Sequence, residues 1–203
     1  MSDNSDLPTG GAVPAPRNAL RSEARRRLLH GGVGATPLLL TLVSRPVLGQ
    51  QCTTPSGFVS MPTSVHGAPQ TCLGRTPGFW KQPQKFSEWP LPYFPTTVTG
   101  PGGHNATRFT QVFNPTPYAS SATFLDVLNM QAGPPNDLAR HVVATALNIA
   151  KGWIPVLTLS QVQAMWNQYM NTGGGTIGYF EPTAGVKWFH DDIVAYLVST
   201  MPV

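Results

Sequence analysis

The stretch Asn136-Asp-Leu-Ala-Arg-His-Val-Val-Ala-Thr-Ala-Leu-Asn-Ile-Ala-Lys151-Gly152 decides the fold of this 203-residue chain. Either Asn136 or Asp137 can cap the start of a helix, and a basic residue followed by glycine closes it. The apolar side chains between these ends wrap most of a helix circumference, which predicts a central and buried helix. These apolar positions are Leu138, Val142, Val143, Ala146, Leu147 and Ile149.

Further helices are predicted on both sides of this stretch. A short one covers residues 121–130, with Ser121 as its cap and glycine and proline after it. A longer one follows Thr158 and Gln161, which have the spacing of a capping box. Its amphipathic stripe ends before a run of glycines and consists of Leu159, Val162, Met165, Trp166, Tyr169 and Met170.

A last helix is predicted from about Trp188 to Thr200. Asp191 and Asp192 fall in its first turn, where negative charge suits the helix dipole. The fold class is therefore mainly α: a small bundle of three to four helices in residues 119–203, preceded by a long irregular arm rich in proline and aromatic residues in residues 50–118.

The arm has few signs of regular structure. Residues 50–73 are irregular in composition, with a weak strand candidate at 57–61. Residues 76–117 are dense in prolines, which fix φ and remove backbone donors, so long elements are not expected. Pro77-Gly78 predicts a type II turn. The many aromatic rings indicate that the arm packs onto the helices.

The overall composition allows a folded core. Hydrophobic residues make up 41% of the chain, charged residues only 11%, and the mean hydropathy is −0.08. Gly and Pro are in excess, with 20 and 21 copies. No apolar run approaches the length that a membrane-spanning helix needs.

Residues 1–49 are interpreted as a disordered leader with an export signal that is cleaved. The pattern Arg25, Arg26, Leu28 and Leu29 resembles the twin-arginine signal, and a glycine-diluted apolar stretch follows it. Small residues before position 50 predict a mature N-terminus at Gln50. The protein is thus expected to be exported and to be periplasmic, cell-surface or extracellular. The alternative is a cytoplasmic protein with a basic disordered arm.

Removal of this leader changes the charge balance. The whole chain has a formal charge of +4, but residues 50–203 contain seven basic against six acidic residues. No basic run is left to neutralise phosphates, which argues against a nucleic-acid partner.

Cys52 and Cys72 both fall in the predicted mature part. Two cysteines in an exported chain most economically pair with each other, and closing the loop between them is worth about 3 kcal/mol in the chain-entropy model. Metal binding is the poorer interpretation because neither cysteine belongs to a C-x-x-C pair. No metal or cofactor is predicted.

Several patterns have a catalytic interpretation and a structural one. The run 173–178 formally matches G-x-G-x-x-G, but a helix precedes it, which favours a helix stop. Asp137 and His141 are spaced to face each other on the central helix and could form an acid–base pair. His190-Asp191-Asp192 offers three ligand types, although consecutive helical residues point in different directions. The structural interpretation, caps and a satisfied histidine, is the expected one.

The aromatic arm is the most distinctive feature. Trp80, Lys81, Trp89 and Tyr93 are candidate binding residues, because rings on loops can stack on sugars or on partner proteins. The alternative is that these rings form a lid over the helices. An exposed patch around Trp80 and Trp89 would favour binding.

The arm also resembles a known module. Gly74-Arg-Thr-Pro-Gly-Phe-Trp-Lys81 after Cys72, followed by Trp89-Pro90, is similar to the "TPGYWK…WP" module of bacterial exported and surface proteins. The likeness covers most of residues 52–201. The usual Asn-His-Pro of the module is replaced by Gln82-Pro83-Gln84, so a role for that histidine does not carry over. The resemblance implies location and architecture, but no activity.

Together these features predict an exported envelope or extracellular module, binding or structural rather than catalytic. Its partner would be a protein or a polysaccharide. The alternative is a secreted hydrolase whose site is assembled from histidines and acids only in the fold.

Overall fold

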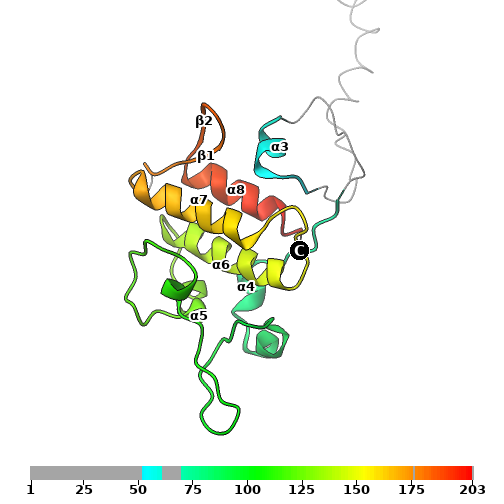
Figure 1. Cartoon of the computed structure of the whole chain (residues 1–203), viewed down its shortest axis with the longest axis vertical. Helices are drawn as coiled ribbons and strands as arrows, with labels where there is room; N and C mark the ends of the chain where they lie inside the picture. The colour runs from blue at the N-terminus through cyan, green and yellow to red at the C-terminus, as the bar shows by residue number, and fades with distance from the viewer. Residues whose placement is uncertain (1–51, 61–69, 176, 203) are drawn as a thin grey trace, which may run out of the picture. The chain divides into compact units, whose positions relative to one another are not determined.

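A computed structural model describes residues 52–60, 70–175 and 177–202, all within one compact unit that spans Leu48–Val203 (Figure 1). The predicted leader, its Arg25, Arg26, Leu28 and Leu29, and the expected cleavage site before Gln50 lie outside the described residues.

Three helices form the core: α6 (Asn136–Ala150), α7 (Leu159–Asn171) and α8 (His190–Ser199). α6 packs against both other helices, and α7 runs back along it in Figure 1. The first turns of α6 and α8 and the last turn of α7 therefore lie at one end of the bundle. Nine of the 15 positions of α6 are buried, which confirms a mainly α fold around a central helix: Leu138, Ala139, Val142, Val143, Ala144, Thr145, Ala146, Leu147 and Asn148.

The capping box before α7 is confirmed. Thr158 Oγ1 accepts the Gln161 N–H at 3.3 Å, and Gln161 Oε1 accepts the Thr158 N–H at 2.8 Å. At the start of α6, the Asp137 carboxylate reaches back to accept the Gly133 N–H at 2.8 Å, while Pro135 precedes the first helical residue. Asp137 thus fixes this helix start from inside the first turn.

Two predicted helix starts are wrong. The short helix, α5, covers Phe124–Leu128 and is capped by Thr123 and Asp126, which form a capping box, rather than by Ser121. The last helix begins at His190, because Trp188 ends a β-strand: β2 (Val186–Trp188) pairs antiparallel with β1 (Phe180–Thr183). Gly185 provides the positive φ of +80° that the tight turn between them needs.

The described part of the arm contains only short elements: α3 (Pro55–Ser60), α4 (Pro77–Trp80) and the 3-10 turns η1 (Pro83–Glu88) and η2 (Phe109–Gln111). The strand candidate at 57–61 is wrong, because residues 57–60 belong to α3. The type II turn at Pro77-Gly78 is also wrong. Pro77 instead opens α4, where its missing N–H costs nothing and its fixed φ suits the helix.

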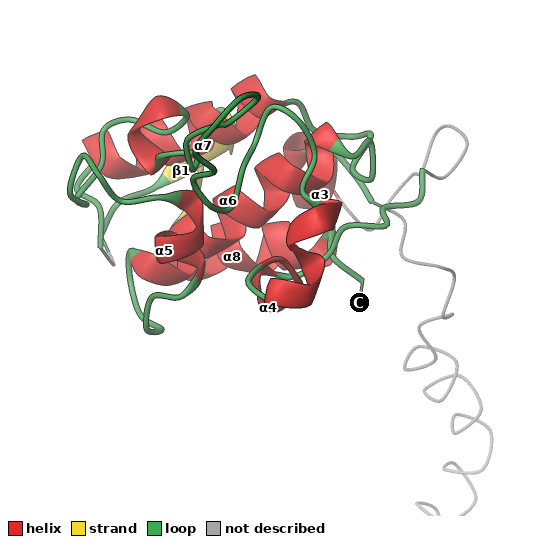
Figure 2. Cartoon of the chain, turned by 90° about the horizontal axis from the view of Figure 1, so that it is seen from below, coloured by secondary structure: helices red, strands yellow, loops and turns green. Residues whose placement is uncertain are grey.

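The arm packs on the helices and shares their core (Figure 2). Phe109 lies 5.2 Å from the ring of Trp166 on α7 and 6.4 Å from that of Phe124 on α5, measured between ring centroids. Trp166 in turn donates its indole N–H to the carbonyl of Pro115 at 2.7 Å. The prediction that the aromatic arm packs onto the helical core is confirmed.

The predicted disulfide is present between Cys52 and Cys72. It joins the α3 segment to the rest of the unit, where the Tyr196 hydroxyl also donates to the Thr53 carbonyl at 2.9 Å. Phe58 of α3 packs edge-on against Trp188 and Tyr196. Covalent and apolar contacts therefore hold this first described segment against β2 and α8.

Among the helices that the structure describes, none has the length and apolar content to cross a membrane.

Candidate functional site

The segment that carries the module-like motif is bound to α6 through one buried side chain. Asn148 Oδ1 accepts the backbone N–H of Arg75 at 2.9 Å and the indole N–H of Trp80 at 3.1 Å. Its Nδ2 donates to the Arg75 carbonyl at 2.8 Å. Asn148 is fully buried, so these bonds satisfy polar groups that water does not reach. The motif is thereby fixed in one register on the helix.

Gly74 permits this close approach. A Cβ added there would lie 2.5 Å from the Thr200 carbonyl oxygen and 3.1 Å from Asn148 Nδ2, whereas one added at Gly78 would meet only Thr76 Oγ1 at 3.6 Å. We expect Gly74→Ala to lower the free energy of unfolding by about 2 kcal/mol, because backbone must move to admit the methyl group. Gly78→Ala, in the same motif, should be neutral or slightly stabilising. Urea unfolding of both variants checks this, and equal effects would contradict it.

The predicted binding rings are largely buried. Trp80 is 0% exposed, Tyr93 7% and Trp89 8%. Trp80 stacks on Trp153 at 5.7 Å between centroids, and the Trp89 indole N–H donates to the Trp80 carbonyl at 3.1 Å. These rings do not form the exposed patch that the sequence analysis required of a binding surface. The structure places them as a lid on the core, and of the four candidates only Lys81 is exposed.

A different set of side chains gathers at the surface of the same motif. We call it the cation–aromatic face: Arg75, Phe79, Lys85, Lys151 and Trp153. The Arg75 guanidinium carbon lies 5.5 Å from the Phe79 ring centroid and 5.8 Å from that of Trp153. Lys85 Nζ is 4.9 Å from the Phe79 centroid, and Lys151 Nζ is 5.7 Å from that of Trp153. Three cations thus surround two half-buried rings.

This face has little negative charge to balance it. Lys85 pairs with Glu88 at 2.8 Å, but no ion pair joins Arg75 or Lys151 to an acid within the described residues. The pKa of the Glu88 carboxyl is lowered, mainly by its hydrogen bond from Lys85 and further by the charges of Lys151 and Arg75. One carboxylate therefore faces three cations. The sequence did not reveal this grouping because Trp153 and Lys151 come from the end of α6, far along the chain from Arg75.

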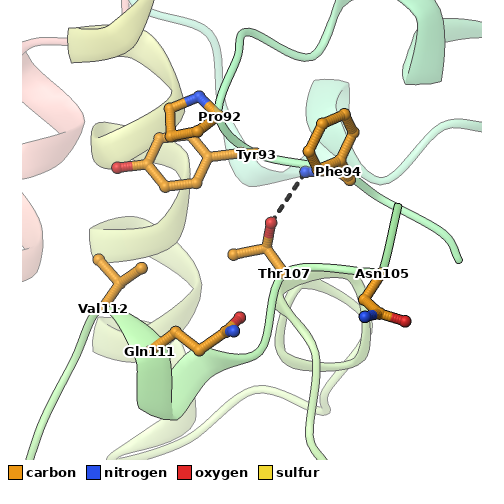
Figure 3. A pocket seen from close by; sticks show the side chains of 7 residues that line it. All are labelled: Pro92, Tyr93, Phe94, Asn105, Thr107, Gln111 and Val112. Carbon is orange, nitrogen blue, oxygen red and sulfur yellow. Dashed lines mark hydrogen bonds between the residues drawn. The ribbon is translucent and has the colours of Figure 1, made fainter. Parts of the chain in front are cut away.

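Tyr93 borders a shallow pocket of about 360 Å³, drawn in Figure 3. Thr107 Oγ1 accepts the Phe94 N–H at 2.8 Å, and Gln111 Oε1 accepts the Arg108 N–H at 2.7 Å. Two of the polar groups in its lining are therefore already used to hold the loops together. The pocket does not present a converging set of free polar groups, so we do not treat it as the site.

The histidines singled out in the sequence do converge, at the end of the bundle that holds the first turns of α6 and α8. His141 lies on α6 and His190 on α8, near enough that the charge of His190 helps to lower the pKa of His141. His141 Nδ1 bonds to the backbone carbonyl of Asp137 at 2.7 Å rather than to its carboxylate, which pairs with Arg140 at 3.2 Å. The carboxylate–imidazole pair of the catalytic interpretation is thus absent, and the expected structural one is observed: Asp137 caps the helix start and His141 is hydrogen-bonded.

His190 forms the only carboxylate–histidine pair in the described part of the chain. Its Nδ1 bonds to Asp191 Oδ1 at 2.7 Å, so the ring nitrogen outside this pair is Nε2. That nitrogen is buried without a partner in the described residues, as is the hydroxyl of nearby Tyr169, whose pKa is raised to about 12, chiefly by burial. Because His190 Nε2 is buried, a substrate that arrives from solvent has no access to it as a base.

Acid should weaken the bundle through His141. Burial lowers the pKa of its imidazole below the ordinary 6.5, with Arg140 and His190 acting in the same direction and Asp137 opposing them. As the pH falls below about 6.5, the unfolded chain binds a proton that the folded protein excludes, so unfolding becomes easier until the folded pKa is passed. Urea unfolding between pH 7.5 and 5 measures this. His141→Gln should flatten the profile, and His104→Gln, in the arm, should leave it unchanged; an equal slope in His141→Gln would contradict the assignment.

The glycine run after α7 ends that helix, as expected. Gly173, Gly174 and Gly175 all have positive φ, and the Gly178 N–H donates to the Gly174 carbonyl at 2.9 Å. A helix precedes this turn and the β1–β2 hairpin follows it, which is not the setting of a dinucleotide-binding loop.

Comparisons of the chain with protein-family models, with curated proteins and with solved structures found no match.

Proposed function

We propose that this protein is an exported, disulfide-linked, non-catalytic module that binds an anionic partner through the cation–aromatic face. The observation that carries the proposal is the placement of three cations over two half-buried rings with one carboxylate among them. Cations without acidic partners on a fold of nearly balanced charge create a local positive potential that attracts negative groups.

The geometry of the motif supports the same conclusion. Asn148 and Gly74 fix the backbone beneath Arg75, while the buried Trp80 supports Trp153 from the core side. A face whose side chains are already positioned loses little conformational entropy when a partner binds. The rings predicted as binding residues would therefore act indirectly, by holding the surface that binds.

Export is supported by the disulfide, since such bonds persist mainly in oxidising compartments. The arginine and leucine pattern of the leader favours the twin-arginine pathway as the route of export. The alternative of a secreted hydrolase receives less support, because the histidine that pairs with a carboxylate keeps its free nitrogen buried.

Cell fractionation tests the proposal. The full chain is produced in a bacterium with a twin-arginine pathway, and the N-terminus is determined by mass spectrometry. We expect cleavage before Gln50 and salt-sensitive association with the envelope. The double substitution Lys85→Gln/Lys151→Gln should release the protein from the envelope. Lys187→Gln, which removes the cation over Tyr179, should not. An intact Met1 and a cytosolic protein would contradict export, and equal release of all variants would contradict the face.

A further inference from the structure

Among the side chains of the cation–aromatic face, Arg75 is the best positioned to bind a ligand, through the two terminal amino groups of its guanidinium. Its backbone is held at both N–H and C=O by Asn148, and its guanidinium lies between two rings. Its Nε is buried and without a partner in the described residues, while the terminal groups are neither fully buried nor bonded to a described acceptor. An arginine in this state offers a planar fork of donors to solvent.

An oxyanion with two oxygens fits that fork. Guanidinium groups bind carboxylates through two parallel N–H···O bonds, which are charge-assisted and shorter than neutral ones. Lys85 and Lys151 lie on the same two rings and add positive charge on either side of the fork. A ligand that carries several negative groups in succession can therefore contact more than one cation.

The rings narrow the class of ligand. Phe79 and Trp153 lie under the cations but are only half-buried, so the exposed part of each ring adds apolar surface that the C–H groups of a sugar can contact while its carboxylate meets Arg75. A membrane surface usually engages several protruding apolar side chains, whereas the only apolar members of this face are Phe79 and Trp153, both half-buried. Only three cations are present, which is few for a nucleic-acid surface.

We propose that the face binds an acidic polysaccharide built from uronic acids, with Arg75 receiving a carboxylate. This inference rests on the proposed function and specifies its ligand. Lys151 assists by charge alone, because an ammonium acts as a point charge rather than as a two-pronged donor. Replacement of Arg75 should therefore cost more affinity than replacement of Lys151.

The test is isothermal titration of the purified full chain with polygalacturonate, with dextran sulfate and dextran as sulfated and neutral comparisons. We expect polygalacturonate to bind and dextran not to bind, with Arg75→Gln weakening the polygalacturonate affinity by about tenfold or more and Lys151→Gln by a few-fold. Lys187→Gln, the matched cation–ring pair on the hairpin, should bind as the original chain does. Urea unfolding confirms that the variants are folded; if Arg75→Gln is not, Lys151→Gln decides the result.

The possible failures are distinguishable. Binding of dextran sulfate or of phosphatidylglycerol vesicles through the same face, without binding of polygalacturonate, would overturn the uronate assignment and leave the proposed binding function intact. Binding of polygalacturonate that none of the face variants alters would overturn both. Equal binding to dextran would show that the carboxylate is not recognised, which also overturns the assignment to Arg75.

Discussion

Asn148→Ala should lower the free energy of unfolding by about 4 kcal/mol. The substitution leaves the Arg75 N–H, the Arg75 carbonyl and the Trp80 indole N–H without their partner, at a place where water does not replace it. Each buried polar group that loses its hydrogen bond costs about 1 to 3 kcal/mol. The effect is large because the Asn148 side chain bonds three groups on a segment that lies 68 to 73 positions away in the chain.

The measurement is urea unfolding followed by tryptophan fluorescence. Asn129→Ala provides the matched control, since Asn129 is exposed at the end of α5 and its amide donates only to the Leu125 carbonyl at 3.0 Å. That control should change stability by less than about 1 kcal/mol. A loss in Asn148→Ala no larger than in the control would mean that the motif is held by its ring contacts alone.

Asn148 also shows what the sequence could and could not predict. The apolar spacing around it identified α6 as buried, because helical periodicity is a local property of the chain. The partners of its amide were not predictable, since nothing local relates Asn148 to Arg75 and Trp80. In the same way, the capping box of Thr158 was predicted from adjacent residues, whereas the packing of Trp188 in the hairpin against Phe58 of α3 is a tertiary contact that no local pattern indicates.

The candidate site shows the same difference between local features, which the sequence predicts, and tertiary packing, which it does not. Local composition identified the aromatic arm as distinctive, but exposure is decided by what packs above each ring. Trp80 and Phe79 are neighbours in sequence, yet Trp80 faces the core and Phe79 the surface. The pairing of Cys52 with Cys72 was predictable because only one pair exists in the predicted mature part.

Breaking this disulfide is the second large effect, about 3 kcal/mol of unfolding free energy. The cysteines are 20 positions apart, and opening a loop of that size returns this much conformational entropy to the unfolded chain. Both cysteines are buried, and the segment they attach contributes Phe58 to the packing around Trp188 and Tyr196. The loss should therefore begin locally, with exchange of the Phe58 amide hydrogen, which in the folded state donates to the Thr54 carbonyl at 2.9 Å.

Dithiothreitol and a Cys52→Ala/Cys72→Ala variant measure the same loss by independent routes. Reduction should lower the urea midpoint of the original chain to that of the variant and should not change the variant itself, which controls for other effects of the reagent. An original chain that unfolds identically with and without reductant would show that apolar contacts alone hold the α3 segment. If the loss is found, the fold is about 3 kcal/mol more stable in an oxidising compartment than in a reducing one. An exported protein would keep this stabilisation, whereas in the cytosol, where thiols are kept reduced, it would be lost.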